Sequence, residues 1–151
     1  MDLSKIKNGQ RIVLGAGLLL IIDIFLPWYG AFGFNINAFD SGFLAWFGSL
    51  CSIAAAVIIA LKAFANMKMN AGPLKAEHLA FALAVLGAFF IFLRLVTETS
   101  LMKFGLWLGL ILAVVLAFGT FLCMKEAGLG VADFKALGGN QGGTPPPPPP
   151  A

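Results

Sequence analysis

Four long apolar stretches, separated by short polar segments, dominate the chain. They cover residues 12–28, 43–61, 79–96 and 104–124. The hydrocarbon core of a bilayer is about 30 Å thick, and about 20 helical residues cross it. Lipid offers the backbone no hydrogen-bond partners, so continuous runs such as IAAAVIIAL predict helices, whereas the strands of a barrel would alternate. The pattern therefore predicts an all-α integral membrane protein with a transmembrane helix at each of these four ranges.

The basic residues are divided unequally between the two sets of connecting segments. Arg94 and Lys103 are the two that lie near segments 29–42 and 97–103. The other eight lie in or beside segments 1–11, 62–78 and 125–151: Lys5, Lys7, Arg11, Lys62, Lys68, Lys75, Lys125 and Lys135. Short cytoplasmic segments are enriched in lysine and arginine. The division predicts cytoplasmic N- and C-termini, a cytoplasmic 62–78 loop, and outer loops at 29–42 and 97–103.

Composition supports this interpretation and excludes several function classes. The chain has 151 residues, of which 60% are hydrophobic and 11% charged. One histidine and two cysteines in separate apolar runs provide neither a metal motif nor a disulfide framework. The scattered lysines do not resemble a nucleic-acid-binding surface. We therefore expect no cofactor, no metal, no nucleic-acid partner and no enzymatic activity. Asp23 and the Pro27-Trp28-Tyr29 sequence argue against a cleaved signal peptide.

Small residues recur on every predicted helix at positions suited to close packing. Such residues allow helix backbones to approach each other in lipid, where the hydrophobic effect is weak. With short connections, they predict an antiparallel four-helix bundle. The GxxxG pair on the fourth helix favours packing within the chain, with a homodimer face as the alternative. The small residues are Gly15, Gly17, Gly48, Ser49, Ala54–Ala56, Ala80, Ala84, Gly87, Ala88, Gly105 and Gly109.

Two charged residues interrupt the predicted spans. Asp23 lies on the first span and Arg94 on the third, both in the outer half of the membrane by their distance along each helix. An unpaired charge at the centre of a span costs about 2.5–3.5 kcal/mol on insertion scales, and less near the interface. We predict an ion pair between Asp23 and Arg94 that links the first and third helices. A structural clamp is the favoured role, with a polar site for a small solute or proton as the alternative.

The first outer loop is rich in aromatic residues. Phe32, Phe34 and Ile36 alternate with small or polar residues, which predicts an extended segment or hairpin folded across the outer mouth of the bundle. Asp40 or Ser41 is the predicted N-cap of the second helix. We expect this loop to provide an interaction surface that contains Trp28, Tyr29, Phe32, Phe34, Asp40 and Trp46.

The C-terminal segment from 125 onward is rich in glycine and proline. Residues 138–143 predict disorder, because such a composition buries little apolar surface. Pro145–Pro150 predict a polyproline II rod. Such a rod either docks into an aromatic groove of a partner or is a low-complexity tail, and the absence of flanking basic residues favours the tail.

Several segments together resemble a family of small four-helix membrane proteins that is common in actinobacteria and has no known activity. They are FLPWYG at 25–30, NAFDSGFLAWFG at 37–48, LRLVTE at 93–98 and GLWLGLILAVV at 105–115. The resemblance covers residues 10–127. It implies location in the plasma membrane and the four-helix arrangement.

The absence of a recognisable catalytic constellation favours a binding role. We expect a non-enzymatic membrane protein that binds or scaffolds a membrane or cytoplasmic partner through the outer loop, the tail or a helix face. The partners considered are the lipid bilayer, another protein and a second copy of the chain. The alternative is a transporter of ions or small solutes, or a subunit of one, with its polar site at Asp23 and Arg94.

Overall fold

The computed structural model describes residues 3–66, 70–71 and 74–135, which are mostly helical. The α-helices of this part are α1 (Asn8–Asp23), α2 (Phe43–Ala65), α3 (Ala76–Thr97) and α4 (Phe104–Glu126). Short 3-10 helices are η1 (Leu3–Lys5) and η2 (Val131–Phe134), and the strands are β1 (Tyr29–Ala31), β2 (Phe34–Ile36), β3 (Asn70–Ala71) and β4 (Leu74–Lys75). The predicted disordered segment and proline rod lie outside the described residues, as does Lys68.

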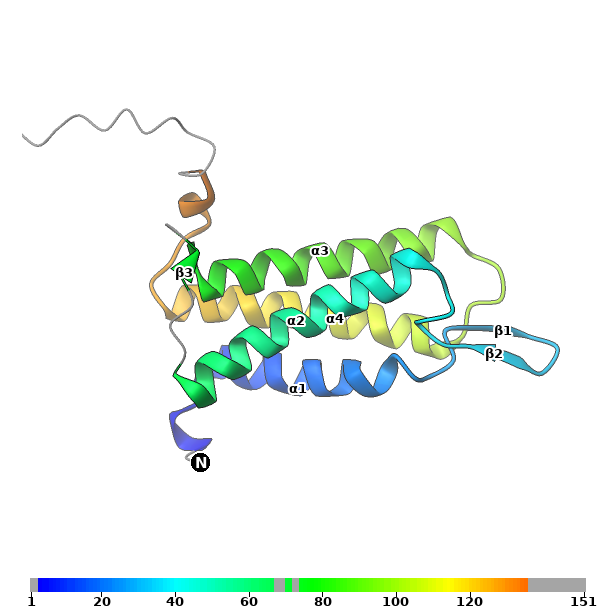
Figure 1. The fold of residues 1–151 in the computed structure, drawn as a ribbon, viewed down its shortest axis with the longest axis horizontal. Coiled ribbons are helices and arrows are strands. Elements are labelled where there is room, and N and C mark those ends of the chain that lie inside the picture. The colour runs from blue at the N-terminus through cyan, green and yellow to red at the C-terminus, as the bar shows by residue number, and fades with distance from the viewer. Residues whose placement is uncertain (1–2, 67–69, 72–73, 136–151) are drawn as a thin grey trace, which may run out of the picture.

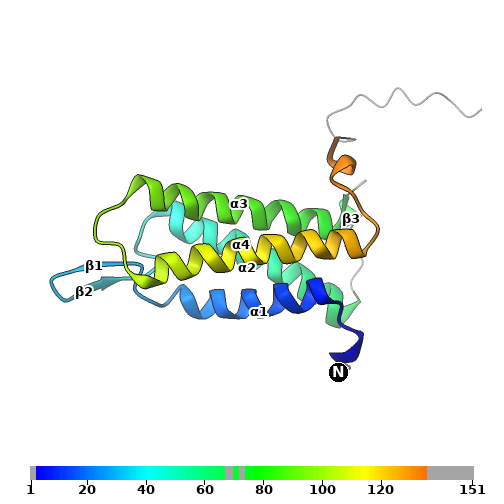
Figure 2. The ribbon, with the colours of Figure 1, turned by 180° about the vertical axis from the view of Figure 1, so that it is seen from behind.

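The four helices lie side by side, and successive helices run in opposite directions (Figure 1). α1 packs mainly against α4 and α2, whereas α3 packs against α2 and α4. α1 and α3 therefore lie on opposite sides of the arrangement, with α2 and α4 between them (Figure 2). We call the end where α1 begins and α4 finishes the basic end. The opposite end, from which β1 and β2 project, is the hairpin end.

Three of the helices are long and apolar enough to cross a membrane: α2, α3 and α4. At about 1.5 Å per residue, their 22 or 23 residues extend for about 33–35 Å. α1 has 16 residues and is not one of these three. Its helix finishes at Asp23 rather than at the predicted residue 28. Pro27 explains the early end, because proline has no N–H and disfavours helical backbone at the residue before it.

Small residues form the close contacts between helices. A Cβ atom on Gly48 of α2 would lie 2.9 Å from the carbonyl oxygen of Gly87 on α3. A Cβ on Gly119 of α4 would lie 2.8 Å from Cγ2 of Val13 on α1. Gly48 and Gly87 are among the small residues predicted to pack closely, whereas Gly119 was not predicted. Gly15 is the exception, because it is exposed and a Cβ there would have nothing within 4 Å.

The outward faces of the helices are apolar. Buried residues such as Val13, Leu20 and Leu116 form the interior. Many large apolar side chains are instead exposed, and an exposed apolar surface of this extent is typical of contact with lipid or protein. Those on the helices include Leu18, Leu19, Ile22, Leu50, Val57, Val85, Phe89, Phe92, Ile111, Val114 and Phe118.

The 29–36 segment forms the predicted hairpin. β1 and β2 are antiparallel, with Tyr29 opposite Ile36 and Ala31 opposite Phe34. The two loop residues, Phe32 and Gly33, have positive φ values of 52° and 86°, as in the type I′ turns that suit the twist of a hairpin. The hairpin extends away from the helix ends and is not folded across them (Figure 1).

The start of α2 differs from the prediction. Gly42, with φ of 101°, is its N-cap, and no side chain provides a capping hydrogen bond. Neither Asp40 nor Ser41 is therefore the cap. Asn37 organises this turn instead, because its side-chain oxygen accepts hydrogen bonds from the backbone N–H groups of Phe39 and Asp40. The Ser41 hydroxyl donates to the Asn37 carbonyl.

Candidate functional site at the hairpin end

Asp23 lies in the interface between α1 and α4, where Trp28 is its hydrogen-bond partner. The indole Nε1 donates to the Asp23 carbonyl oxygen at 3.1 Å and to its carboxylate Oδ2 at 3.2 Å. Gly109 of α4 leaves room for both side chains, because a Cβ there would lie 2.7 Å from Cζ2 of Trp28. Asp23 is 1% exposed, and its Oδ1 has no hydrogen-bond partner. Asp23 thus holds Trp28 against α4.

Arg94 does not form the predicted ion pair with Asp23. Its guanidinium lies over the ring of Tyr29, 5.0 Å from the centroid. Among the described residues, the ion pairs within 4.0 Å are Lys62–Glu77 and His78–Asp133. The physical reason is the arrangement of the helices, since α1 and α3 lie on opposite sides of the molecule. The predicted ion pair is therefore wrong: Asp23 bonds to Trp28, and Arg94 packs on Tyr29.

Tyr29 connects the hairpin to the C-terminal end of α3. Its hydroxyl lies 3.4 Å from the carbonyl oxygen of Arg94 and 3.2 Å from that of Glu98, and it donates to these two acceptors. The Arg94 carbonyl also accepts hydrogen bonds from the backbone N–H of Glu98 and from the Thr97 hydroxyl, so the Tyr29 hydroxyl is a further donor at the C-terminal end of α3. Burial raises the pKa of the Tyr29 hydroxyl, the positive charge of Arg94 lowers it, and Glu98 raises it. Tyr29 thus stays protonated at neutral pH.

The 98–103 loop completes the site by bonding to β1 and to the residue before it. The Gly30 N–H donates to the Leu101 carbonyl at 3.1 Å, and the Lys103 N–H donates to the Trp28 carbonyl at 2.8 Å. The Lys103 ammonium also donates to the side-chain oxygen of Asn35 on β2. The loop between α3 and α4 is therefore attached to the hairpin along its length.

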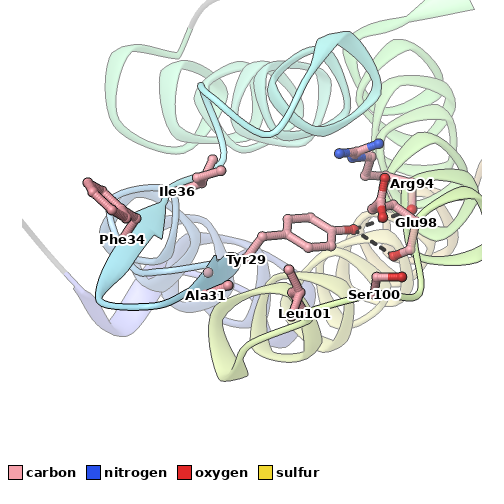
Figure 3. Close-up of a pocket in the computed structure, with 9 residues that line it drawn as sticks. Tyr29, Ala31, Phe34, Ile36, Arg94, Glu98, Ser100 and Leu101 are labelled. Carbon is pink, nitrogen blue, oxygen red and sulfur yellow. Dashed lines mark hydrogen bonds between the residues drawn. The ribbon is translucent and has the colours of Figure 1, made fainter.

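A pocket of about 320 Å³ lies between the hairpin, this loop and the end of α3 (Figure 3). Tyr29 points across it towards Arg94 and Glu98. Phe34, Ile36 and Leu101 provide apolar walls, and Ser100 lies at its edge. Pockets that bind small molecules typically have volumes of about 300–1,000 Å³ and mostly apolar walls with a few polar groups. This pocket has both properties.

The six residues of the predicted outer-loop surface do not share one surface. Trp28 is 0% exposed and Tyr29 is 5% exposed, so both belong to the interior. Phe32 and Phe34, at 99% and 77%, are the exposed aromatic residues of the hairpin. Asp40 is exposed in the following turn, and Trp46 is half-buried and packs edge-on against Phe43. Phe32 and Phe34 are therefore the accessible aromatic part of the predicted surface.

A second group of charged residues lies at the basic end. Lys62 of α2 forms an ion pair with Glu77 of α3, whose side chain is 4% exposed. Lys7 donates to the carbonyl oxygen of Glu126 at 3.0 Å, and the Glu126 carboxylate accepts from the backbone N–H of Gly9 at 3.2 Å. These bonds connect α2 with α3, and the start of α1 with the end of α4. In the described part of the chain, no group of three or more His, Cys, Asp and Glu side chains is placed to hold a metal ion.

His78 is buried and has several partners. Its Nε2 lies 3.3 Å from Oδ2 of Asp133. Its ring packs edge-on against Phe134, with 5.1 Å between centroids. These contacts attach the 3-10 helix η2 to the start of α3.

Neither Glu98 nor Glu77 was among the residues predicted from the sequence to form a site. Glu98 follows Arg94 by four residues, a spacing that would place both side chains on one face if the helix continued, and this spacing was the available signal. Glu77 had no such signal, because its partner Lys62 comes from another helix. Comparisons of the chain with protein families, with curated proteins and with solved structures find no match. The resemblance to a family of four-helix membrane proteins stays a prediction.

Proposed function

We propose that the chain is a non-enzymatic, multi-pass plasma-membrane protein that binds a protein partner through its hairpin. Three helices have the length and composition of membrane spans. The exposed apolar residues of the helices would face lipid in that setting. The polar clusters at the two ends would then lie near the two membrane surfaces. The observation that carries the partner-binding role is the exposed aromatic pair Phe32 and Phe34.

The proposal includes α1 as a fourth span. α1 packs along α4, and its residues Val13 and Leu20 are fully buried there. Its opposite face exposes Leu18, Leu19 and Ile22. A bilayer that surrounds α4 would therefore surround α1 as well. The helix is about 24 Å long, and local thinning of the bilayer accommodates a short span at modest cost.

Phe32 is an unusual residue for its position. A φ of 52° puts it in the left-handed region, where asparagine and glycine are far more favourable than an aromatic residue. Its side chain is 99% exposed, so no contact within the chain compensates this cost. A strained residue that packs against nothing in its own protein supports a role in contact with another molecule.

Replacement of Phe32 by asparagine separates binding from folding. Asparagine favours the turn conformation, so the Phe32→Asn variant keeps the hairpin and loses the aromatic ring. A photo-activatable aromatic residue at position 34 reports contact in native membranes. We expect this residue to crosslink to one discrete protein. An excess of untagged wild-type chain should compete away the crosslink, whereas an excess of untagged Phe32→Asn chain should not. The matched control is the same residue at position 118, on the exposed face of α4.

Crosslinks to lipid alone from position 34 would contradict the partner-binding role. A crosslinked species of twice 15.9 kDa would identify a second copy of the chain as the partner. In a further outcome, the crosslink is retained in Phe32→Asn and lost when the chain is truncated after Lys135. That outcome would assign the binding role to the C-terminal tail. That result would favour a cytoplasmic partner.

A transporter role is the alternative proposal. It is supported by the buried Asp23 carboxylate, because its Oδ1 has no hydrogen-bond partner. The Trp28 hydrogen bond argues for a structural role, and the pocket at the hairpin end is not lined by Asp23. Flux of protons or small solutes into liposomes, lost in the Asp23→Asn variant but kept in Phe32→Asn, would favour transport. Equal flux in protein-free liposomes would reject it.

A further inference from the structure

Two opposite charges line the pocket at the hairpin end without pairing with each other. Arg94 lies in the last turn of α3, and Glu98 is the C-cap of that helix. Both contribute to the pocket wall (Figure 3). Neither has an ion-pair partner within 4.0 Å among the residues that the structure describes. The pocket therefore offers one positive group and one negative group, with no net charge.

Tyr29 fixes the position of this pair of charges. Its ring lies beneath the guanidinium of Arg94 at 5.0 Å, and its hydroxyl is bonded to the backbone of both Arg94 and Glu98. The Nε atom of Arg94 is buried and has no hydrogen-bond partner. A buried donor without a partner is costly, and the cost is larger for a charged group. An anionic oxygen at the terminal nitrogens of the guanidinium would compensate its positive charge.

The rest of the pocket is apolar and opens to the surface. Phe34 and Leu101, which line it, are 77% and 60% exposed. Its volume of about 320 Å³ is near the lower limit for pockets that bind small molecules, so it suits the head of an amphipathic molecule rather than a whole lipid. Apolar groups of the ligand would leave the pocket past these two side chains.

We propose that this pocket binds the headgroup of a zwitterionic aminophospholipid, with its phosphate at Arg94 and its primary ammonium at Glu98. The proposal rests on the membrane location given above, which places the pocket at the outer surface of the bilayer. Guanidinium groups bind phosphate oxygens through paired N–H donors. A carboxylate accepts hydrogen bonds from a primary ammonium, whereas a quaternary ammonium has no N–H to donate. The headgroup of an anionic lipid without an amine would place no positive charge beside Glu98, so the charge of Glu98 would stay uncompensated.

Lipid binding to the purified full-length chain tests the proposal. Native mass spectrometry from detergent, after addition of one phospholipid at a time, measures how much of each stays bound. The probes are phosphatidylethanolamine, phosphatidylcholine and phosphatidylglycerol with identical acyl chains. The ammonium adds one charge-assisted hydrogen bond, so we expect phosphatidylethanolamine to bind about tenfold more tightly than the other two, which corresponds to about 1.4 kcal/mol.

Two variants assign the charges. Glu98→Gln removes the negative group without changing the shape of the side chain, so its expected effect is loss of the preference for phosphatidylethanolamine over phosphatidylglycerol. Arg94→Gln should weaken the binding of all three lipids. Lys125→Gln, an exposed position at the basic end, is the matched control and should leave the preference unchanged. Thermal unfolding in lipid-free detergent verifies that each variant folds. If Arg94→Gln does not fold, the lipid preference of Glu98→Gln by itself still tests the proposal.

Equal binding of the three lipids to wild-type chain, or an unchanged preference in Glu98→Gln, would overturn the proposal. Soluble phosphoethanolamine that binds as tightly as the lipid would also overturn it, by assigning the pocket to a water-soluble zwitterion. Membrane location and partner crosslinking are measured separately from lipid preference. Failure of the lipid assignment is therefore distinguishable from failure of the proposed function.

Discussion

At the scale of single residues, the contact of Asp23 and Trp28 with Gly109 decides how α1 meets α4. The indole and the carboxylate occupy the space where a side chain on Gly109 would lie. In a bilayer, such a contact depends on close fit, because lipid tails are as apolar as the protein interior. One methyl group at this position should therefore have a measurable effect.

We predict that Gly109→Ala lowers the free energy of unfolding by about 1–3 kcal/mol, because overpacking displaces Trp28 and Asp23. Gly15→Ala is the matched control, since it adds the same methyl group to an exposed helical site with open space. Alanine in a helix interior is more favourable than glycine by about 0.5–1 kcal/mol, so the control should be slightly stabilised. Thermal unfolding in detergent measures both. Equal effects of the two changes would contradict the packing described for Gly109.

Tyr29 provides a pH-dependent prediction. The pKa of its hydroxyl is raised above 10.0, mainly by burial, so the folded state keeps its proton at pH values where the unfolded state releases it. The neutral hydroxyl thus contributes its full stability below about pH 10, and this contribution declines as the pH rises above that value. Loss of its hydrogen bonds in Tyr29→Phe should cost about 1 kcal/mol at neutral pH.

The measurement compares the free energy of unfolding of wild-type chain and Tyr29→Phe from neutral to alkaline pH. The difference between them should shrink above about pH 10. Tyr29 is the single tyrosine of the chain, so tyrosinate absorbance reports its ionisation directly. Ionisation at or below pH 10 in the folded protein would contradict the burial and bonding of this hydroxyl.

At the scale of elements, charged contacts at the helix ends complement the apolar contacts between helices. α2 and α3 are tied by the Lys62–Glu77 ion pair, and the Glu77 side chain lies almost entirely in the interior. Glu77 also lies in the first turn of α3, where the helix dipole favours a negative charge. Removal of one partner leaves the other charge buried without compensation.

We predict that Lys62→Met lowers the free energy of unfolding by about 3 kcal/mol, because Glu77 is left unpaired. The double variant Lys62→Met/Glu77→Gln should regain much of this loss, since no buried charge remains. Lys125→Met, which replaces an exposed lysine at the same end, is the control and should have little effect. A double-mutant cycle measures the coupling. Additive effects of the two changes would show that Lys62 and Glu77 do not interact.

At the scale of the whole molecule, the helices place the start of α1 and the end of α4 at one end and the hairpin at the other. The proposed four-span topology assigns these two ends to opposite sides of the membrane. Lys5 and Lys125 belong to the basic end, and Asp40 precedes α2 at the hairpin end. The topology is therefore testable at three exposed positions.

Labelling with a membrane-impermeant thiol reagent tests this topology. Single cysteines replace Lys5, Asp40 and Lys125 in turn, in a chain whose buried Cys51 and Cys123 are changed to serine. In intact cells, we expect labelling of the Asp40→Cys chain alone, and the other two should react only after the membrane is permeabilised. Labelling of Lys5→Cys from outside, on the same side as Asp40→Cys, would show that α1 does not cross the membrane.

The sequence by itself determined where the helices and the hairpin lie. Continuous apolar runs cannot satisfy their backbone in lipid except as helices, and α2 and α4 begin at the predicted Phe43 and Phe104. The alternation of residues 32–37 predicted an extended segment or a hairpin, and the structure has the hairpin. These features depend on neighbouring residues along the chain, so they could be read from it directly.

The tertiary structure alone decided which side chains meet. The sequence predicted that Asp23 and Arg94 both lie in the outer half of the membrane, but the packing of α1 and α3 on opposite sides keeps the two charges apart. The tertiary structure also places Trp28 in the interior and leaves Phe32 exposed, although both belong to one aromatic segment. Helical periodicity determines which face a residue occupies, whereas the neighbour of that face depends on how all the helices fit together. For this reason the walls that the hairpin and Leu101 give to the pocket could not be derived from the sequence, although the spacing of Arg94 and Glu98 could.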